Sequence, residues 1–117
     1  MAVAIKDFGG RYRRLSETSA ANTALSVTTP SAVPHRLLFA TVKYSAAPTQ
    51  AGVTTEIDSG VGAGSDVVLN TGAANAQATV YAPDAELRVA DGDAFKVTAP
   101  AGGAGITASI VVYVELL

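Results

Sequence analysis

The sequence contains no cysteine and no tryptophan, and it has a single histidine, His35. Without cysteine there can be no disulfide, no thiolate metal site and no thiol nucleophile. One histidine also leaves a transition-metal site short of its usual nitrogen and sulfur ligands. We therefore expect no metal or other cofactor, and we expect stability to come from packing or from association with neighbouring chains.

Charge is sparse. Eight basic and ten acidic residues give a formal net charge of −2, which excludes a strong overall field that would draw the protein to nucleic acid or to an anionic membrane. The charges are unevenly distributed along the chain. Residues 1–14 hold four basic residues and one acidic residue, a net charge of +3, whereas residues 15–117 hold four basic and nine acidic residues, a net charge of −5.

The sequence has no long hydrophobic run. It begins MAVAIKDFGG, where the apolar stretch after Met1, residues 2–5, is four residues long and too short for the core of a signal peptide. The apolar closing stretch, residues 106–117, is interrupted by polar residues such as Thr107 and Glu115. Nothing approaches the ~20 apolar residues that cross a bilayer, so we expect no membrane-spanning segment.

Large side chains are also few, with three phenylalanines and four tyrosines among 117 residues. A chain of this length forms one domain, which buries roughly two thirds of the surface that its unfolded form exposes. The core must then be thin and built from valine, isoleucine and leucine. Such a core suits two packed sheets better than a helical bundle.

Short segments of alternating apolar and polar residues follow one another along the chain. The longest of the first half is residues 35–44 (HRLLFATVKY), which has Leu37 and Phe39 on one face and Leu38 and Ala40 on the other. Because both faces are apolar, we expect this strand to be central in its sheet. In the closing strand, one face is predicted to carry Ile106, Ala108, Ile110, Val112 and Val114.

Residues 81–97 (YAPDAELRVADGDAFKV) contain the clearest turn signal in the sequence, ADGD at positions 90–93. Apolar residues alternate on both sides of it, at Leu87 and Val89 before the turn and at Phe95 after it. This pattern predicts a β-hairpin with one buried face.

In all we count about eight strands after residue 22, joined by loops too short for the helical crossovers that parallel strands need. No helical period extends beyond two turns. The prediction is an all-β fold: an antiparallel β-sandwich, either a jelly-roll or a related Greek key, with an extended N-terminal arm.

Residues 1–22 differ from the rest because they have no apolar face of their own. We expect them to form the arm, extended or ordered against a partner, and residues 23–117 to form the β-sandwich domain. The arm holds the only basic cluster, Arg11, Tyr12, Arg13 and Arg14. These side chains can stay solvated, pair with carboxylates of a neighbouring protein or contact phosphate. Three arginines bind nucleic acid only weakly, so nucleic acid is the least favoured of the three.

The residues that could support catalysis or ligand binding can also be explained by structural roles. His35 lacks a recognisable nucleophile and orienting carboxylate, so we interpret it as structural or as a surface residue. The glycine-rich residues 60–64 are predicted to be a flexible loop, since no helix follows to cradle a phosphate. Four acidic residues lie within ten positions and can supply calcium ligands, although aspartates beside a glycine also favour a tight turn. These are Asp84, Glu86, Asp91 and Asp93.

From His35 onward the order of segments resembles the small β-sandwich virion proteins of tailed bacteriophages, particularly those that decorate or cement heads. The resemblance is carried by Leu37–Ser45, Ala47–Thr49, Val53–Gly60, Tyr81–Pro83, the Glu86-Leu87 strand with its Asp91–Asp93 turn, and the apolar closing strand. These motifs also occur in other jelly-rolls, including trimeric receptor-binding and adhesion heads.

What the resemblance implies is a non-enzymatic structural protein located in the virion and assembled in the host cytoplasm. Its partners would be the major capsid protein or other virion proteins, and it would form a homo-oligomer, with a trimer favoured. The family offers no catalytic residues to transfer. A protein-contact role is carried onto the basic cluster Arg11, Tyr12, Arg13 and Arg14.

Two other functions remain open. A glycan- or receptor-binding module of a phage tail or fibre would need an exposed aromatic platform, for which Tyr44, Tyr81 and Tyr113 are the candidates. A hydrolase on a jelly-roll scaffold is the least favoured, for want of a constellation of histidine and acidic residues.

Overall fold

The computed structural model describes residues 3–117, and within them the regular structure is β-strand apart from one 3-10 turn. The elements are β1 (Ala4–Asp7), β2 (Tyr12–Thr18), β3 (Leu25–Thr28), β4 (His35–Tyr44), β5 (Thr54–Asp58), the 3-10 turn η1 (Ala63–Ser65), β6 (Val67–Thr71), β7 (Ala78–Tyr81), β8 (Arg88–Val89), β9 (Ala94–Ala99) and β10 (Ala108–Leu116).

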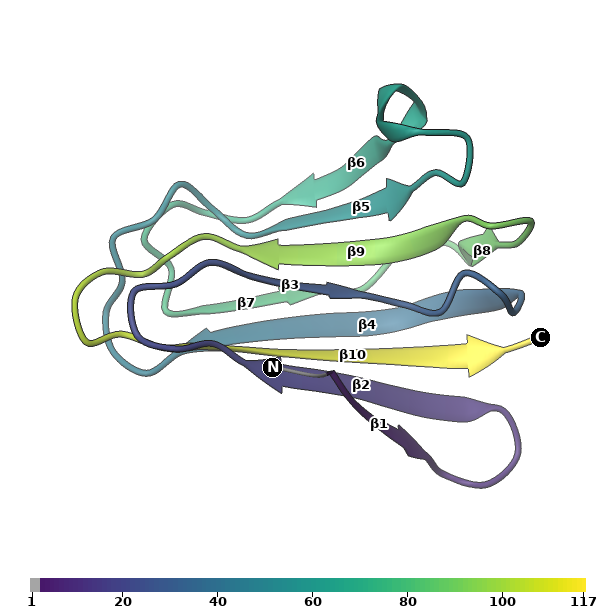
Figure 1. Cartoon of the computed structure of the whole chain (residues 1–117), viewed down its shortest axis with the longest axis horizontal. Coiled ribbons are helices and arrows are strands. Elements are labelled where there is room, and N and C mark those ends of the chain that lie inside the picture. The colour runs from purple at the N-terminus through teal and green to yellow at the C-terminus, as the bar shows by residue number, and fades with distance from the viewer. Residues whose placement is uncertain (1–2) are drawn as a thin grey trace.

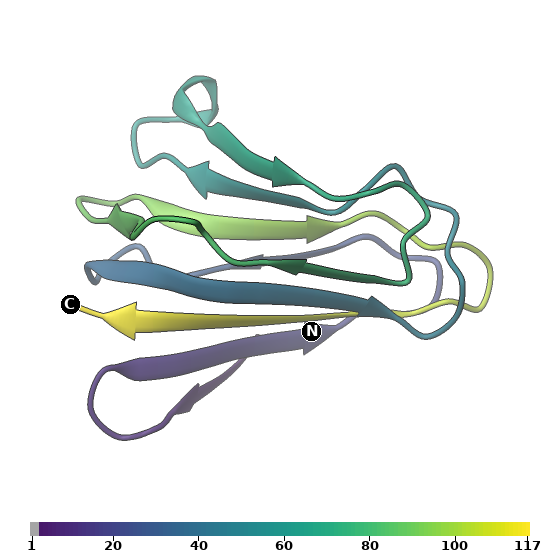
Figure 2. The ribbon, with the colours of Figure 1, turned by 180° about the vertical axis from the view of Figure 1, so that it is seen from behind.

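The strands form two antiparallel sheets that lie face to face (Figures 1 and 2). The first sheet has the order β1-β2-β10-β4-β7, with β8 pairing beside β7 on the same edge of β4, and the second has the order β3-β9-β5-β6. The all-β, sandwich-like architecture is thus confirmed, as is the expectation of about eight strands after residue 22. No helix in the described residues is long and apolar enough to cross a membrane.

The core between the sheets is built mainly from valine, leucine and isoleucine, as the composition predicts. The predicted inward face of the closing strand is confirmed within β10, where Ala108, Ile110, Val112 and Val114 are all almost fully buried. Ile106 lies before β10 and is partly buried against the core. The bulkiest core side chain is that of Tyr44, whose hydroxyl donates to the carbonyl oxygen of Pro100 at 2.7 Å. That bond satisfies the one polar group of an otherwise apolar side chain.

Strand β4 occupies the predicted range and the predicted central position, but its faces are not as predicted. The register with β10 shifts between Tyr113 and Val114, so that Leu38 has no partner and forms a β-bulge. The extra residue brings both Leu37 and Ala40 into the core and turns Phe39 outward, where it is 37% exposed. Strict alternation, which grouped Leu37 with Phe39, is wrong for this reason.

The N-terminal segment also differs from the prediction. Over residues 4–18 it is a β-hairpin of the first sheet, with β2 paired to β10 from Ser109↔Thr18 to Glu115↔Tyr12. Leu15 is only 1% exposed and packs in the core. This segment is therefore a hairpin and not the expected extended arm. A single leucine within a basic stretch reaches the core, and the backbone groups of β2 form hydrogen bonds with β10. Residues 1–2 of that arm lie outside the described part of the chain.

The expected hairpin of residues 81–97 is corrected as well. The turn is present, with Asp91 at φ 58°, Gly92 at φ 93° and the amide of Asp93 donating to the carbonyl oxygen of Ala90 at 3.1 Å. However, β8 pairs with β4 in the first sheet, whereas β9 pairs with β3 and β5 in the second. The turn thus connects the two sheets, and the buried faces of the two strands meet across the core.

Candidate contact surface

The most distinctive surface of the molecule is the outer face of the first sheet. Successive side chains of a strand point to opposite sides, so the residues that alternate with the buried ones in β2, β4 and β10 share this face. Among residues 3–117, no other element of the fold covers it (Figure 2). The hairpin β1–β2, β10 and β4 bring together here residues that lie far apart in the sequence.

A row of aromatic side chains crosses this face. The rings of Phe39 on β4 and Tyr113 on β10 stack with centroids 4.7 Å apart, and Phe8, next to the β1–β2 turn, stacks on the other side of Tyr113 at 6.2 Å. Phe8 is 47% exposed. The bulge at Leu38 is what turns Phe39 outward and completes the row, which we call the aromatic row.

Two cations extend the aromatic row at the hairpin. Lys6 and Arg14 are cross-strand partners in β1 and β2, and both approach the ring of Phe8: the Lys6 Nζ lies 5.4 Å and the Arg14 Cζ 5.5 Å from its centroid. The attraction between a cation and the ring face offsets the repulsion expected of two like charges directly opposite each other. The hairpin thus carries fixed positive charge beside exposed aromatic surface.

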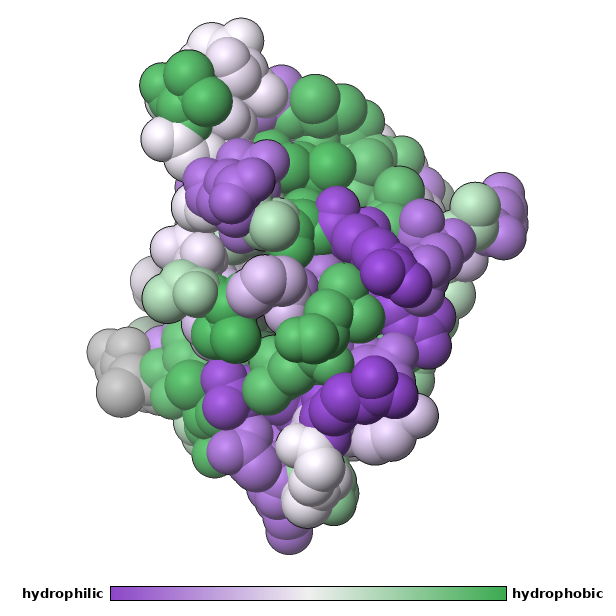
Figure 3. Space-filling model, turned by 90° about the vertical axis from the view of Figure 1, so that its right-hand side faces the viewer, coloured by the Kyte–Doolittle hydropathy of each residue, from purple (hydrophilic) through white to green (hydrophobic). Residues whose placement is uncertain are grey.

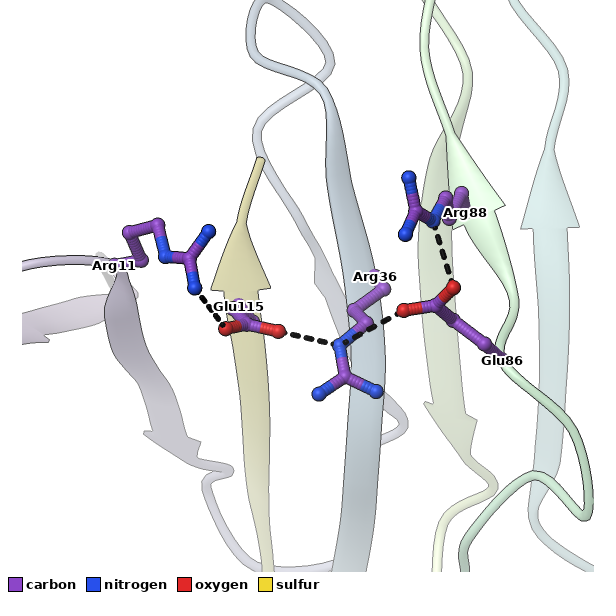
Figure 4. Close-up of polar contacts among 5 residues, drawn as sticks. All are labelled: Arg11, Arg36, Glu86, Arg88 and Glu115. Carbon is purple, nitrogen blue, oxygen red and sulfur yellow. Dashed lines mark hydrogen bonds and ion pairs between the residues drawn. The ribbon is translucent and has the colours of Figure 1, made fainter.

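A row of alternating ion pairs lies beside the aromatic row, at the end of the sheet that holds the C-terminus (Figure 4). Arg11 Nη2 lies 3.2 Å from Glu115 Oε2, Arg36 Nε bonds the other oxygen of Glu115 and lies 3.5 Å from Glu86 Oε1, and Arg88 Nε donates to Glu86 Oε2 at 2.8 Å. These side chains connect the β1–β2 turn, β10, β4, the loop before β8, and β8 itself.

The central carboxylate of this row is shielded from solvent. The Glu115 side chain is 8% exposed, because guanidinium groups cover it from both sides. The hydrogen bond to Glu115 raises the pKa of Arg36 from its usual value, and the hydrogen bond from Arg88 lowers the pKa of Glu86. With three guanidinium groups and two carboxylates, the row has a formal net charge of +1.

The outer face of the first sheet is consequently basic. The charged residues that strand register and the ion pairs place on it are six basic and two acidic, a formal net charge of +4 in a protein whose total is −2. We call it the basic face. Its charged residues are Lys6, Arg11, Arg14, Arg36, Lys43, Arg88, Glu86 and Glu115.

The structure separates the four residues of the predicted cluster. Arg11 and Arg14 lie on the basic face in the contacts described above, and Tyr12, opposite Glu115 in β2, is 49% exposed. Arg13 points to the other side of the sheet, where its Nε donates to Asp7 Oδ1 at 2.6 Å. Sequence reasoning missed Phe8 and Phe39, and it named Tyr113 only as part of a glycan platform with Tyr44 and Tyr81. The proximity of Phe8, Phe39 and Tyr113 depends on strand register and on the bulge rather than on spacing along the chain.

His35 occupies a structural position. It is fully buried, its Nδ1 donates to the carbonyl oxygen of Val33 at 2.7 Å, and its Nε2 lies 2.6 Å from Thr29 Oγ1. Since the carbonyl can only accept, Nδ1 carries a proton, and Nε2 accepts from the Thr29 hydroxyl when the ring is neutral. Burial lowers the pKa of His35. A neutral imidazole thus satisfies both ring nitrogens between the sheets.

The acidic candidates do not converge on one point. Asp93 Oδ1 accepts from the amide of Gly60 at 2.8 Å and so connects the β8–β9 turn to the β5–β6 loop, whereas Glu86 belongs to the ion-pair row. Within residues 3–117, no group of three or more acidic or histidine side chains is arranged to hold a metal ion. The predicted loop at residues 60–64 is largely irregular and leads into η1.

The three tyrosines predicted to form a glycan-binding platform do not form one exposed surface. Tyr44 is 1% exposed, and Tyr113 is stacked between Phe8 and Phe39. An open surface hollow of about 310 Å³ lies beside the hairpin and is lined by Ser16, Thr18 and Ser109 among others.

Comparison with models of known protein families finds no match, and a search of curated proteins finds no relative.

Proposed function

We propose that the protein is a non-enzymatic structural protein of a phage virion, most specifically one that decorates or cements the head. In this proposal it acts as a homo-oligomer, with a trimer favoured, and contacts the major capsid protein or other virion proteins. It assembles in the host cytoplasm and remains in the virion.

The observation that carries the proposal is the basic face with its aromatic row. Protein interfaces are enriched in aromatic residues and arginine around a desolvated centre. Here Phe8, Phe39 and Tyr113 form such a centre, and Lys6 and Arg14 lie at its margin. The sequence predicted that a loose arm would contact the partner. In this proposal the ordered hairpin β1–β2 makes that contact, and it contributes three of these five side chains.

The order of the strands supports a finer description of the fold. We infer a jelly-roll, because β2-β10-β4-β7 faces β3-β9-β5-β6 and successive strands repeatedly cross between the sheets. In this arrangement two Greek keys are wound together, as in viral capsid proteins, lectins and cupins. A fold shared by such different proteins does not decide a function. It is compatible with a virion role, and the surface supplies the argument.

The test is co-sedimentation with empty heads assembled from the major capsid protein encoded in the same genome. We expect saturable binding at a fixed ratio to the capsid subunits. We also expect weaker binding by Arg14→Glu than by Lys96→Glu, a substitution of equal charge change on β9 of the second sheet. Heads that bind none of the wild-type protein, or a genome that encodes no capsid protein, would contradict the proposal.

A further inference from the structure

We propose that the basic face of one copy binds the acidic end of another, so that the protein assembles through repeated head-to-tail contacts. The inference rests on the proposed function only in taking the working form to be an assembly of identical chains. It identifies the two surfaces of the chain that meet in that assembly.

The acidic end is formed by the β5–β6 loop, the start of β6 and the β8–β9 turn, which the bond from Gly60 to Asp93 holds together. Its acidic residues are Asp58, Asp66, Asp91 and Asp93. Three valines are exposed in the same region: Val61 is 87%, Val67 52% and Val68 58% exposed. Strand β6 is also an edge strand, with a row of backbone groups available for a partner.

The two surfaces complement each other in both charge and polarity. The basic face presents aromatic side chains among cations, and the acidic end presents aliphatic side chains among carboxylates. Figure 3 views the end of the molecule that includes the C-terminus and η1, and shows hydrophobic residues in patches bordered by hydrophilic ones. Such an arrangement favours a contact with an apolar centre and paired charges at its rim.

Charge also excludes the symmetric alternative. If two basic faces met around a two-fold axis, each would bring a net charge of about +4 against its own kind, and like charges facing across an interface cost several kcal/mol. In Figure 2, which looks onto the basic face, η1 of the acidic end lies at the margin of the molecule, whereas the β8–β9 turn of the acidic end lies next to β8. A contact between the basic face of one copy and the acidic end of the next joins different surfaces, and repeated contacts of this kind produce a ring where the rotation closes.

The experiment measures the mass of the full-length chain in solution by light scattering or sedimentation at physiological salt, without capsids. Arg14→Glu reverses a charge on the basic face and Asp58→Lys one at the acidic end, where Asp58 is the last residue of β5. Lys96→Glu is the control for charge alone. We expect an oligomer for the wild type and the control, and dissociation constants at least about tenfold higher for the two test variants.

Mixing the variants gives the sharpest result. An equimolar mixture of Arg14→Glu and Asp58→Lys contains an intact basic face on one chain and an intact acidic end on the other. The mixture should therefore associate more tightly than either variant does alone. Circular dichroism checks that each variant is folded, and Lys6→Glu replaces Arg14→Glu if the latter is not.

Three results would overturn the inference: a wild-type monomer at all concentrations, equal masses for Arg14→Glu and Lys96→Glu, or no association in the mixture. A labelled single-stranded oligonucleotide that binds the wild type but not Arg14→Glu, with no change in protein mass, would assign the face to nucleic acid instead. A capsid-binding failure with the mixing result intact would contradict the virion role and leave this contact standing.

Discussion

Replacing Leu15 by alanine tests whether the N-terminal hairpin is part of the folded domain. Leu15 is 1% exposed, lies between β1 and β10 and belongs to the core cluster. Truncating a buried leucine removes its transfer free energy and leaves a cavity, at a cost of about 2–5 kcal/mol. Since domains of this size are stable by about 5–15 kcal/mol, the loss would be a large part of the total.

The assay is urea unfolding of Leu15→Ala followed by far-ultraviolet circular dichroism, with Ile5→Ala as the matched control. Ile5 is the cross-strand partner of Leu15 but is 56% exposed, so its truncation should cost less than about 1 kcal/mol. A Leu15→Ala protein as stable as the control, or a chain lacking residues 1–18 that unfolds at the wild-type urea concentration, would refute the placement of β2 in the sheet.

Three further substitutions test other parts of the structure. Because burial lowers the pKa of His35, the unfolded chain takes up a proton below pH ~6.5 that the folded chain does not. The free energy of unfolding should thus fall with decreasing pH, by up to about 1.4 kcal/mol per pH unit, until the pH passes the folded-state pKa of His35. Urea titrations between pH 8 and 5 should show a smaller pH dependence of this free energy for His35→Gln. The same pH dependence for the variant and the wild type would contradict a neutral ring. Gly92→Ala should cost about 1–2 kcal/mol in the same assay, because Gly92 has φ 93°, and an unchanged midpoint would count against the turn geometry. Glu115→Gln should lower the melting temperature less than Leu15→Ala does. Addition of 1 M NaCl should reduce the difference in melting temperature between Glu115→Gln and the wild type, because salt screens the ion pairs. A melting temperature equal to that of the wild type at low salt would show that the ion pairs contribute no stability.

The sequence predicts those elements whose alternation is regular. The inward residues of β10 follow directly from the pattern, because the strand is long enough to show a period of two. The range of β4 also follows from its apolar residues, although the bulge at Leu38 breaks its alternation. Alternation tells which side chains share a face, but it does not identify the neighbouring strand. Val89 and Phe95 are both buried on either side of a good turn, and yet their strands belong to different sheets.

The candidate surface was harder to predict for a related reason. The basic cluster is visible in the sequence, but the alternation of Arg13 and Arg14 across β2 divides it between two faces. Phe39 reaches the aromatic row only because the bulge at Leu38 shifts the phase of β4, and no residue there signals a bulge. Leu15 carries the whole apolar signal of β2, which is too little for pattern reasoning to distinguish a strand from a loose arm.

In the proposed assembly, a second copy of the chain covers the outer face of the first sheet. Hydroxyl-radical footprinting read by mass spectrometry measures this directly at Phe8, Phe39 and Tyr113. The account predicts that these rings are protected in the wild-type assembly and become reactive in dissociated Arg14→Glu protein. Equal reactivity of all three rings in both samples would contradict it.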